Sequence, residues 1–187
     1  MSEFKNAFIF HGTAGSPEGN WFPWLKNELE QRGIPTSVPR FPTPDGESLD
    51  AWFAVLDVDN EKIGPETLLI GHSKGGMFLL KVLERLAEPV KAAIFVAAPV
   101  GEKPILYYEE DKKFSNFDFK WNEIVGKAQK FIVYHSDNDP YVSLANGEKL
   151  ANELSVGVSL IPNAGHLNAE SGFTEFQPLL AQILALM

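Results

Sequence analysis

The segment Gly71-His72-Ser73-Lys74-Gly75 lies between two apolar runs, residues 67–70 and 77–86. The first run has the length of a buried strand, and the second has the length of a helix. A serine with a glycine on each side, placed between a strand and a helix, is typical of a nucleophile elbow. A side chain at either glycine would collide with a neighbouring element, and the serine itself must tolerate a strained backbone. We therefore expect Ser73 to present its hydroxyl above the end of a sheet.

Strand-like and helix-like segments alternate along the chain. Strands are predicted at residues 7–10, 36–41, 67–70, 92–97, 131–134 and 158–161. Helices are predicted at residues 21–29, 49–56, 77–86, 144–154 and 173–187, the second of them capped by Ser48. This alternation predicts an α/β fold, a compact three-layer sandwich in which helices cover both faces of a mostly parallel sheet of about six strands.

The length of 187 residues fits a single domain over residues 1–187. Its irregular part is the segment 99–121, in which aromatic side chains stand among charged ones. A connection of this length without clear periodicity is often functional, so we interpret the segment as a lid or pocket wall. The alternative is a poorly ordered insertion that buries its aromatic side chains locally.

The composition excludes several classes of function. A formal net charge of −9 repels phosphate backbones, so nucleic acid is not expected as a partner. The chain has no cysteine, and its 4 histidines lack the paired spacing of a zinc site, so neither a metal nor another cofactor is expected. The sequence shows no secretory signal and no apolar stretch of the ~20 residues that span a bilayer. We therefore expect a cytoplasmic protein without membrane attachment.

A serine hydroxyl is a poor nucleophile at neutral pH and needs a base, which in turn needs an acid to orient it. His166 lies in a loop after the last predicted strand, and an imidazole can accept and return the serine proton. Asp139 also follows a predicted strand, although an aspartate before Pro140 serves equally well as a helix cap. The order serine, aspartate, histidine is that of α/β-hydrolases. Ser73, Asp139 and His166 are the candidate catalytic triad, with Asp137 as the alternative acid.

Two backbone amides are candidates for an oxyanion hole, which stabilises the negative oxygen of a tetrahedral intermediate. One is the amide of Lys74 at the start of the helix after the elbow, where the helix dipole favours negative charge. The other is the amide of Thr13, in a loop of small residues after the first predicted strand. The alternative for this loop is a plain glycine turn.

Aromatic side chains are candidates for the wall of a substrate pocket. Trp21, Tyr107 and Tyr108 are predicted to contact an apolar acyl or alcohol group, and Gly12 to contact the substrate from the loop after the first strand. Core packing is the alternative for the aromatic residues, because aromatic side chains at helical spacing are more often buried than functional.

With these residues in place, the chain resembles the small α/β-hydrolases of the YdeN type, which are related to the mammalian retinoblastoma-binding serine hydrolase. The motifs that carry the resemblance, nearly end to end, are Phe10-His11-Gly12, Trp21-Phe22-Pro23-Trp24-Leu25, Gly71–Gly76, Asp139-Pro140 and Gly165-His166. The resemblance implies that Ser73 is the nucleophile, Asp139 the acid and His166 the base. Lys74 departs from the small or apolar residue that many hydrolases carry there, and its side chain would either favour anionic substrates or block bulky ones.

The sequence thus predicts a serine hydrolase that cleaves a carboxylic ester, in preference to an amide, through an acyl-enzyme on Ser73. The expected partner is a small-molecule ester or acyl compound. The alternative is a protein-binding module on a hydrolase scaffold with little or no turnover. In that case the acidic, aromatic segment 107–121 would be a docking surface for a protein partner.

Overall fold

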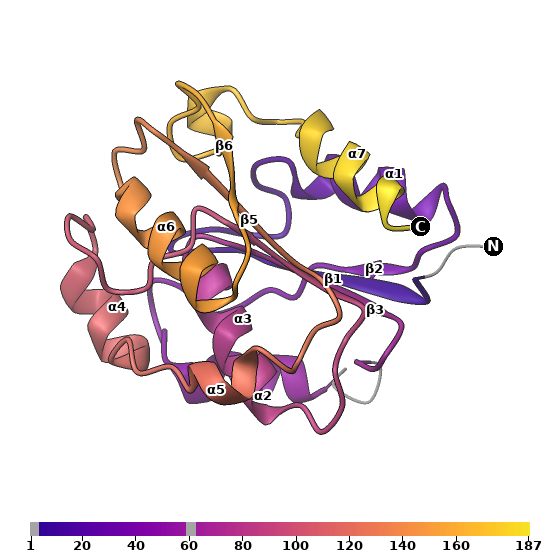
Figure 1. Ribbon diagram of the computed structural model, residues 1–187, viewed down its shortest axis with the longest axis horizontal. Coiled ribbons are helices and arrows are strands. Elements are labelled where there is room, and N and C mark those ends of the chain that lie inside the picture. Colours follow the sequence, from indigo (N-terminus) through magenta and orange to yellow (C-terminus); the bar gives the residue numbers. More distant parts are fainter. Residues whose placement is uncertain (1–3, 59–62) are drawn as a thin grey trace.

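The computed structural model describes residues 4–58 and 63–187, which form a six-stranded sheet with helices on both faces (Figure 1). The strands are β1 (Asn6–Phe10), β2 (Thr36–Ser37), β3 (Thr67–His72), β4 (Ala92–Val96), β5 (Phe131–Ser136) and β6 (Val158–Ile161). They pair in the order β2-β1-β3-β4-β5-β6, and each pair is parallel. The predicted α/β sandwich is confirmed.

The helices alternate with the strands. They are α1 (Phe22–Glu30), α2 (Leu49–Asp57), α3 (Lys74–Arg85), α4 (Tyr108–Ser115), α5 (Trp121–Ile124), α6 (Leu144–Glu153) and α7 (Gln177–Ala185). Ser48 caps α2 as predicted, because its Oγ accepts a hydrogen bond from the Ala51 amide at 3.1 Å. Because the strands are parallel, their carboxyl ends meet at one edge of the sheet, where ligand sites of this architecture lie.

Alternate side chains of the central strands serve two separate cores. In β1, Phe8 and Phe10 belong to one core, while Ala7 and Ile9 belong to the other. The first core lies under α2, α3 and α6, and the second lies under α1 and α7 (Figure 1). Both faces of β3 are buried, which explains why the elbow follows a continuous apolar run rather than an alternating one.

The two largest differences from the predicted boundaries are in β2 and α7. β2 ends at Ser37 and does not extend over residues 36–41, because Pro39 follows and a proline cannot donate a hydrogen bond to the next strand. The last helix begins only at Gln177, with Pro178 in its first turn, where the missing amide hydrogen would have no helical acceptor.

The segment 99–121 contains α4 and leads into α5, although the sequence shows no clear periodicity there. Asp111 and Phe114 are the buried residues of α4, and the rest of this helix is largely charged. Phe114 and Phe119 pack into the core under α3, which removes them from a docking surface on this segment. Tyr107, just before α4, remains 44% exposed.

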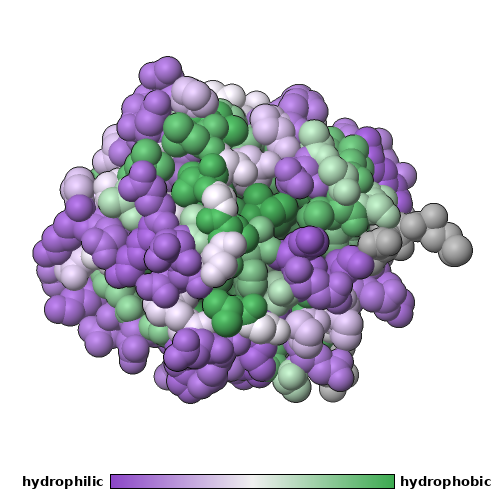
Figure 2. Space-filling view, in the orientation of Figure 1, coloured by the Kyte–Doolittle hydropathy of each residue, from purple (hydrophilic) through white to green (hydrophobic). Residues whose placement is uncertain are grey.

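Figure 2 shows hydrophilic side chains around the rim of one face of the molecule and hydrophobic side chains in a strip across its middle. Leu160 of the edge strand β6 and Leu184 of α7 are among the exposed large hydrophobic residues. Within the described part of the chain, no helix combines the length and the apolar character needed to cross a membrane.

Candidate active site

Ser73 occupies a strained turn between β3 and α3. Its φ of 54° and ψ of −129° lie in a region that residues other than glycine rarely adopt. A Cβ atom on Gly75 would lie 2.1 Å from the Phe10 carbonyl oxygen, and one on Gly71 would lie 2.5 Å from the Gly75 carbonyl oxygen. The two glycines therefore allow the close packing against β1 and α3 that is expected of an elbow.

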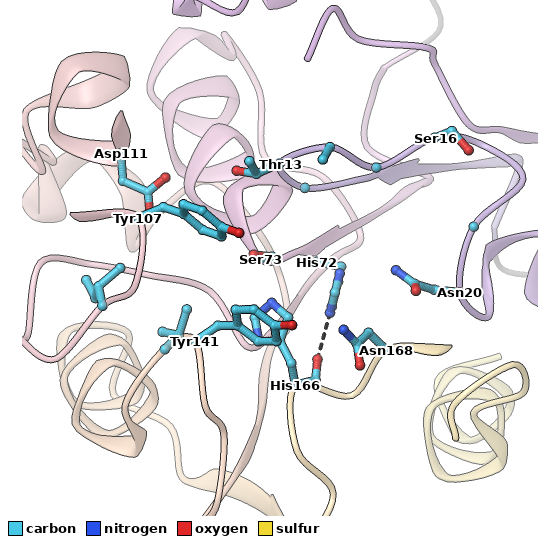
Figure 3. Close-up of a pocket in the computed structure, with 16 residues that line it drawn as sticks. Thr13, Ser16, Asn20, His72, Ser73, Tyr107, Asp111, Tyr141, His166 and Asn168 are labelled. Atoms are coloured by element: carbon cyan, nitrogen blue, oxygen red, sulfur yellow. Dashed lines mark hydrogen bonds between the residues drawn. The ribbon is translucent and has the colours of Figure 1, made fainter. Parts of the chain in front are cut away.

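Ser73 lines a cavity of about 350 Å³ to which segments from both halves of the chain contribute (Figure 3). Of the predicted site residues, Gly12, Thr13, Tyr107 and His166 line the same cavity. They come from the loop after β1, the segment before α4 and the loop after β6. Folding thus brings residues from distant parts of the sequence around one serine.

His166 and Asp139 form a buried hydrogen-bonded pair. His166 Nδ1 donates to Asp139 Oδ2 at 2.7 Å, and the Asp139 side chain is fully buried. Asp139 Oδ1 accepts hydrogen bonds from the backbone amides of Tyr141 and Val142, at 2.8 and 3.0 Å. Burial opposes ionisation of Asp139, but the hydrogen bonds from His166 and these two amides outweigh it and lower the pKa. With the Nδ1 proton held by the carboxylate, a neutral His166 has its lone pair on Nε2.

Asp137, the alternative acid, has a different role in the structure. The side chains of residues 136–138 accept hydrogen bonds from the backbone amides of residues 163–165, at 2.7 to 3.0 Å. Asp137 contributes one of these bonds. Three consecutive side chains after β5 thereby hold three consecutive amides of the loop that carries His166. The pairing with His166 is made by Asp139.

His72 and Trp21 support the same loop from the other side. His72 Nε2 donates to the His166 carbonyl oxygen at 2.9 Å, the contact drawn as a dashed line in Figure 3. Trp21 Nε1 donates to the next carbonyl oxygen, that of Leu167, at 3.0 Å. Burial, aided by the nearby His166 imidazole, lowers the pKa of His72 to about 3. His72 is therefore neutral at physiological pH, and it fixes the backbone at His166.

Two of the predicted substrate contacts are corrected by the structure. Trp21 is fully buried in the core under α1 and α7, 5.9 Å from Phe176 between ring centroids, and is not part of the cavity wall. Tyr108 packs on Phe117 with ring centroids 5.2 Å apart, and Lys103 Nζ lies 3.9 Å from its ring centroid. Trp21 therefore packs in the core, and the half-buried Tyr108 contacts its own segment, because aromatic spacing does not distinguish a core from a pocket.

Of the two residues predicted to supply oxyanion amides, Lys74 follows Ser73 directly and Thr13 lines the same cavity as Ser73. Lys74 is the first residue of α3, so its amide has no acceptor within the helix. Thr13 follows Gly12, where an added Cβ atom would lie 2.8 Å from Ser73 Cβ. The loop after β1 therefore lies directly against the elbow.

The Lys74 side chain takes part in a buried charged cluster. It is 1% exposed, its Nζ pairs with Glu47, and the same atom lies 3.2 Å from Asp111 Oδ1. Two carboxyl groups thus face one ammonium group. Attraction of an anionic substrate by Lys74, one of the two effects expected from the sequence, is not supported by this arrangement.

Sequence reasoning missed Tyr141, Asp111 and Asn168, which also line the cavity. The Tyr141 ring centroid lies 4.9 Å from that of His166, and its nearness to Asp139 in the sequence was a usable signal. Asp111 gave no signal, because it is the last of three consecutive acidic residues in a charged segment. Within residues 4–58 and 63–187, no three His, Asp or Glu side chains are placed to hold a metal ion.

A family model described as serine hydrolase matches residues 7–185. The chain belongs to the serine hydrolase family. It is similar to the putative hydrolase YdeN of Bacillus subtilis, with 26% identity over 96% of this chain and 94% of YdeN. It is also similar to serine hydrolase RBBP9 of Rattus norvegicus, with 22% identity over 100% of this chain and 98% of that protein. The predicted resemblance to the YdeN type is confirmed.

Solved structures show the same fold for this serine hydrolase. The crystal structure of the ydeN gene product from B. subtilis matches it with a TM-score of 0.89 and 24% identity, covering 97% of this chain and 98% of that one. The esterase domain of a Rhodothermus marinus protein matches with a TM-score of 0.69 and 18% identity, covering 97% and 86%. The protein is a hydrolase with the α/β-hydrolase fold.

Proposed function

We propose that this serine hydrolase cleaves a carboxylic ester through an acyl-enzyme on Ser73, with His166 as the base and Asp139 as the acid that orients it. The observation that carries the proposal is the 2.7 Å hydrogen bond from His166 Nδ1 to the buried Asp139 carboxylate. It leaves His166 Nε2 as a proton acceptor in a side chain that lines the same cavity as Ser73.

In the first half of the reaction, His166 Nε2 accepts the Ser73 Oγ proton while Oγ attacks the ester carbonyl carbon. The bond between the carbonyl carbon and the alcohol oxygen then breaks, and the imidazolium returns its proton to that oxygen. Asp139 remains ionised and stabilises the imidazolium, which its lowered pKa favours. The products of this half are an acyl group on Ser73 and a free alcohol.

In the second half, His166 accepts a proton from a water molecule as the water oxygen attacks the acyl carbon. The bond to Ser73 Oγ breaks, Oγ regains the proton from the imidazolium, and a carboxylic acid leaves. The same two groups therefore serve both halves, and no further proton donor is required.

We assign the oxyanion hole to the backbone amides of Lys74 and Thr13. The first stands at the N-terminus of α3, where unpaired amides and the helix dipole favour a negative oxygen. The second lies in the loop that packs against the elbow at Gly12. Losing one such donor typically costs about 3 kcal/mol of transition-state stabilisation.

The cavity favours a small substrate with an apolar part. Ile105 and Val142 contribute apolar wall, and the rings of Tyr107 and Tyr141 stack with centroids 6.5 Å apart near Ser73 (Figure 3). A volume of about 350 Å³ is at the lower end for ligand pockets. Short-chain esters are the proposed substrates, and the likeness to an esterase domain supports an ester over an amide.

Labelling with a fluorophosphonate probe tests the nucleophile assignment. We expect the wild-type protein to become labelled and the Ser73→Ala variant to remain unlabelled. Ser16→Ala is the matched control, because Ser16 lines the same cavity but stands outside the elbow. Labelling of folded Ser73→Ala at the wild-type rate would refute the proposal. A screen of aryl esters of graded acyl length, with Ser73→Ala as the blank, defines the substrate range.

A further inference from the structure

Asp111 is a buried carboxyl group in the wall of the cavity that holds Ser73. Its side chain is 5% exposed and projects from α4, one turn after Tyr107. Figure 3 shows the Asp111 carboxyl group beside the Tyr107 ring, on the side of the cavity that faces Thr13 and Ser73. An ionisable group in this wall is placed to interact with a substrate in the cavity.

One oxygen of the Asp111 carboxyl group has no hydrogen-bond partner among the described residues. Within the described residues, Asp111 Oδ1 is buried without a hydrogen-bond partner, although it lies 3.2 Å from Lys74 Nζ. Lys74 Nζ is hydrogen-bonded instead to Glu47, on the other side of the ammonium group. The Lys74 charge is thus shared by two carboxyl groups, and one negative charge of the cluster has no counterpart. A buried acceptor in this state is costly unless a ligand supplies a donor.

The rest of the cavity wall does not compensate this charge. Among the described residues that line the cavity, Asp111 is the only acidic residue, and none is lysine or arginine. The polar groups around Ser73 include the neutral side chains of Asn20 and Asn168. An anionic substrate would meet repulsion from Asp111, whereas a cationic donor would meet an acceptor.

We infer that Asp111 recognises an ammonium group on the substrate, so that the favoured substrates are esters whose acyl or alcohol part carries a protonated primary amine. This inference rests on the proposed ester hydrolysis and names its substrate class. An ammonium group would donate a hydrogen bond to Asp111 and complete the charge balance of the cluster with Lys74 and Glu47. A neutral isostere would leave the carboxylate unpaired.

The ionisation of Asp111 gives the recognition a pH range. Burial raises the pKa of Asp111 to about 6, against the opposing effect of Lys74, and the charges of Glu47 and Glu110 raise it further. Asp111 therefore becomes a full negative charge only above that pH. The preference for an ammonium substrate over its neutral isostere should weaken as the pH falls from 7 to 5.

Matched ester pairs test the inference. For the acyl side, the p-nitrophenyl ester of 3-aminopropanoic acid is compared with that of butanoic acid. For the alcohol side, 4-(aminomethyl)phenyl butanoate is compared with 4-ethylphenyl butanoate. Each kcat/KM is divided by the rate of uncatalysed hydrolysis. In one of the two series we expect a preference of about tenfold or more for the ammonium ester, the usual range of a charged hydrogen bond.

The Asp111→Asn variant should reduce this preference to within about twofold, because the amide carries no charge. Glu110→Gln is the control, since it removes the same charge from an exposed neighbour on α4 and should retain the preference. No preference in the wild-type protein, or an undiminished preference in folded Asp111→Asn, would overturn the inference.

A binding measurement separates this inference from the proposed function. Calorimetric titration with butylammonium and with 1-butanol requires no turnover. Butylammonium should bind the wild-type protein about tenfold more tightly than it binds Asp111→Asn, while 1-butanol should bind the two equally. If no ester is hydrolysed, the proposed function fails and this titration still decides the inference. Equal affinity of butylammonium for both proteins would overturn it.

Discussion

Asp139 and Asp137 stand two residues apart, yet the structure gives them different partners. Asp139 accepts the His166 Nδ1 proton, whereas Asp137 accepts a backbone amide from the loop before His166. The first contact selects an imidazole tautomer, and the second holds a loop. The effect of removing each charge should therefore differ in kind.

Asp139→Asn should lower kcat for an aryl ester by about 10³- to 10⁴-fold, because an amide no longer fixes the tautomer with Nε2 free or stabilises the imidazolium. Asp137→Asn keeps an acceptor oxygen for the amide of Asn163 and should lower kcat by less than about tenfold. Steady-state kinetics of the two variants measures this difference in kcat. A larger loss in Asp137→Asn would contradict the assignment of the acid.

His72 acts through the backbone of the His166 loop. Its removal in His72→Phe leaves the His166 carbonyl oxygen without a donor, and we expect a loss of about 1–3 kcal/mol in the free energy of unfolding. The misplaced imidazole should also lower kcat by about tenfold. His72→Gln offers an amide donor and should restore part of both. Urea unfolding and ester kinetics give the two readouts, and undiminished kcat in His72→Phe would exclude the positioning role.

At the scale of the secondary-structure element, α3 approaches the sheet so closely that its first turn excludes a methyl group. Gly75→Ala would place a Cβ atom 2.1 Å from the Phe10 carbonyl oxygen, which is backbone and has little freedom to move. We expect a loss of more than about 3 kcal/mol in the free energy of unfolding. Gly157→Ala, whose added Cβ atom meets nothing within 4 Å, should change it by less than about 1 kcal/mol. Equal unfolding midpoints in urea would contradict the close approach.

The elements that sequence reasoning predicted well are those with strong local signals. The strand 67–70 and the helix after it were recognisable because a buried parallel strand is apolar throughout and a covering helix carries an apolar face. α4 was not recognisable, because its buried positions are Asp111 and Phe114, and a buried carboxyl group looks like a surface residue in a sequence.

The same limit applies to site residues. Ser73, Asp139 and His166 could be proposed because each follows a predicted strand. Ser73 lies in a turn between a strand and a helix, and the other two lie in segments after strands. Trp21 was assigned to the substrate pocket, but it is buried in the core, because the spacing of aromatic residues does not distinguish a core from a pocket. Asp111 lines the cavity only because α4 packs against α3, and that contact is a property of tertiary structure.

At the scale of the whole molecule, three buried histidines make the fold sensitive to acid. Burial lowers the pKa of His11, His72 and His135. The pKa of His72 falls to about 3. Unfolded histidines bind protons near pH 6.5, so unfolding takes up protons below that pH and stability falls with the pH. Asp111 acts in the opposite direction, because its raised pKa lets the folded state bind a proton first.

Because its folded pKa is about 3, His72 alone should lower the free energy of unfolding by about 2 kcal/mol from pH 7 to pH 5. His11 and His135 act in the same direction, and Asp111 opposes them, so we expect a net fall over this range. Urea unfolding at a series of pH values measures this change. His11→Gln removes one of the three titrations and should make the dependence shallower. A free energy of unfolding that stays constant or rises from pH 7 to pH 5 would contradict the burial of neutral histidines.

Detection of the covalent acyl intermediate on Ser73 is the most direct test of the proposed mechanism. The measurement is mass spectrometry of peptides from protein quenched in acid during turnover of p-nitrophenyl butanoate. We expect one butanoyl group on the peptide that contains Ser73, and none in the Ser73→Ala variant. Release of p-nitrophenol at the same rate by both proteins, with no acyl group on this peptide, would contradict the account.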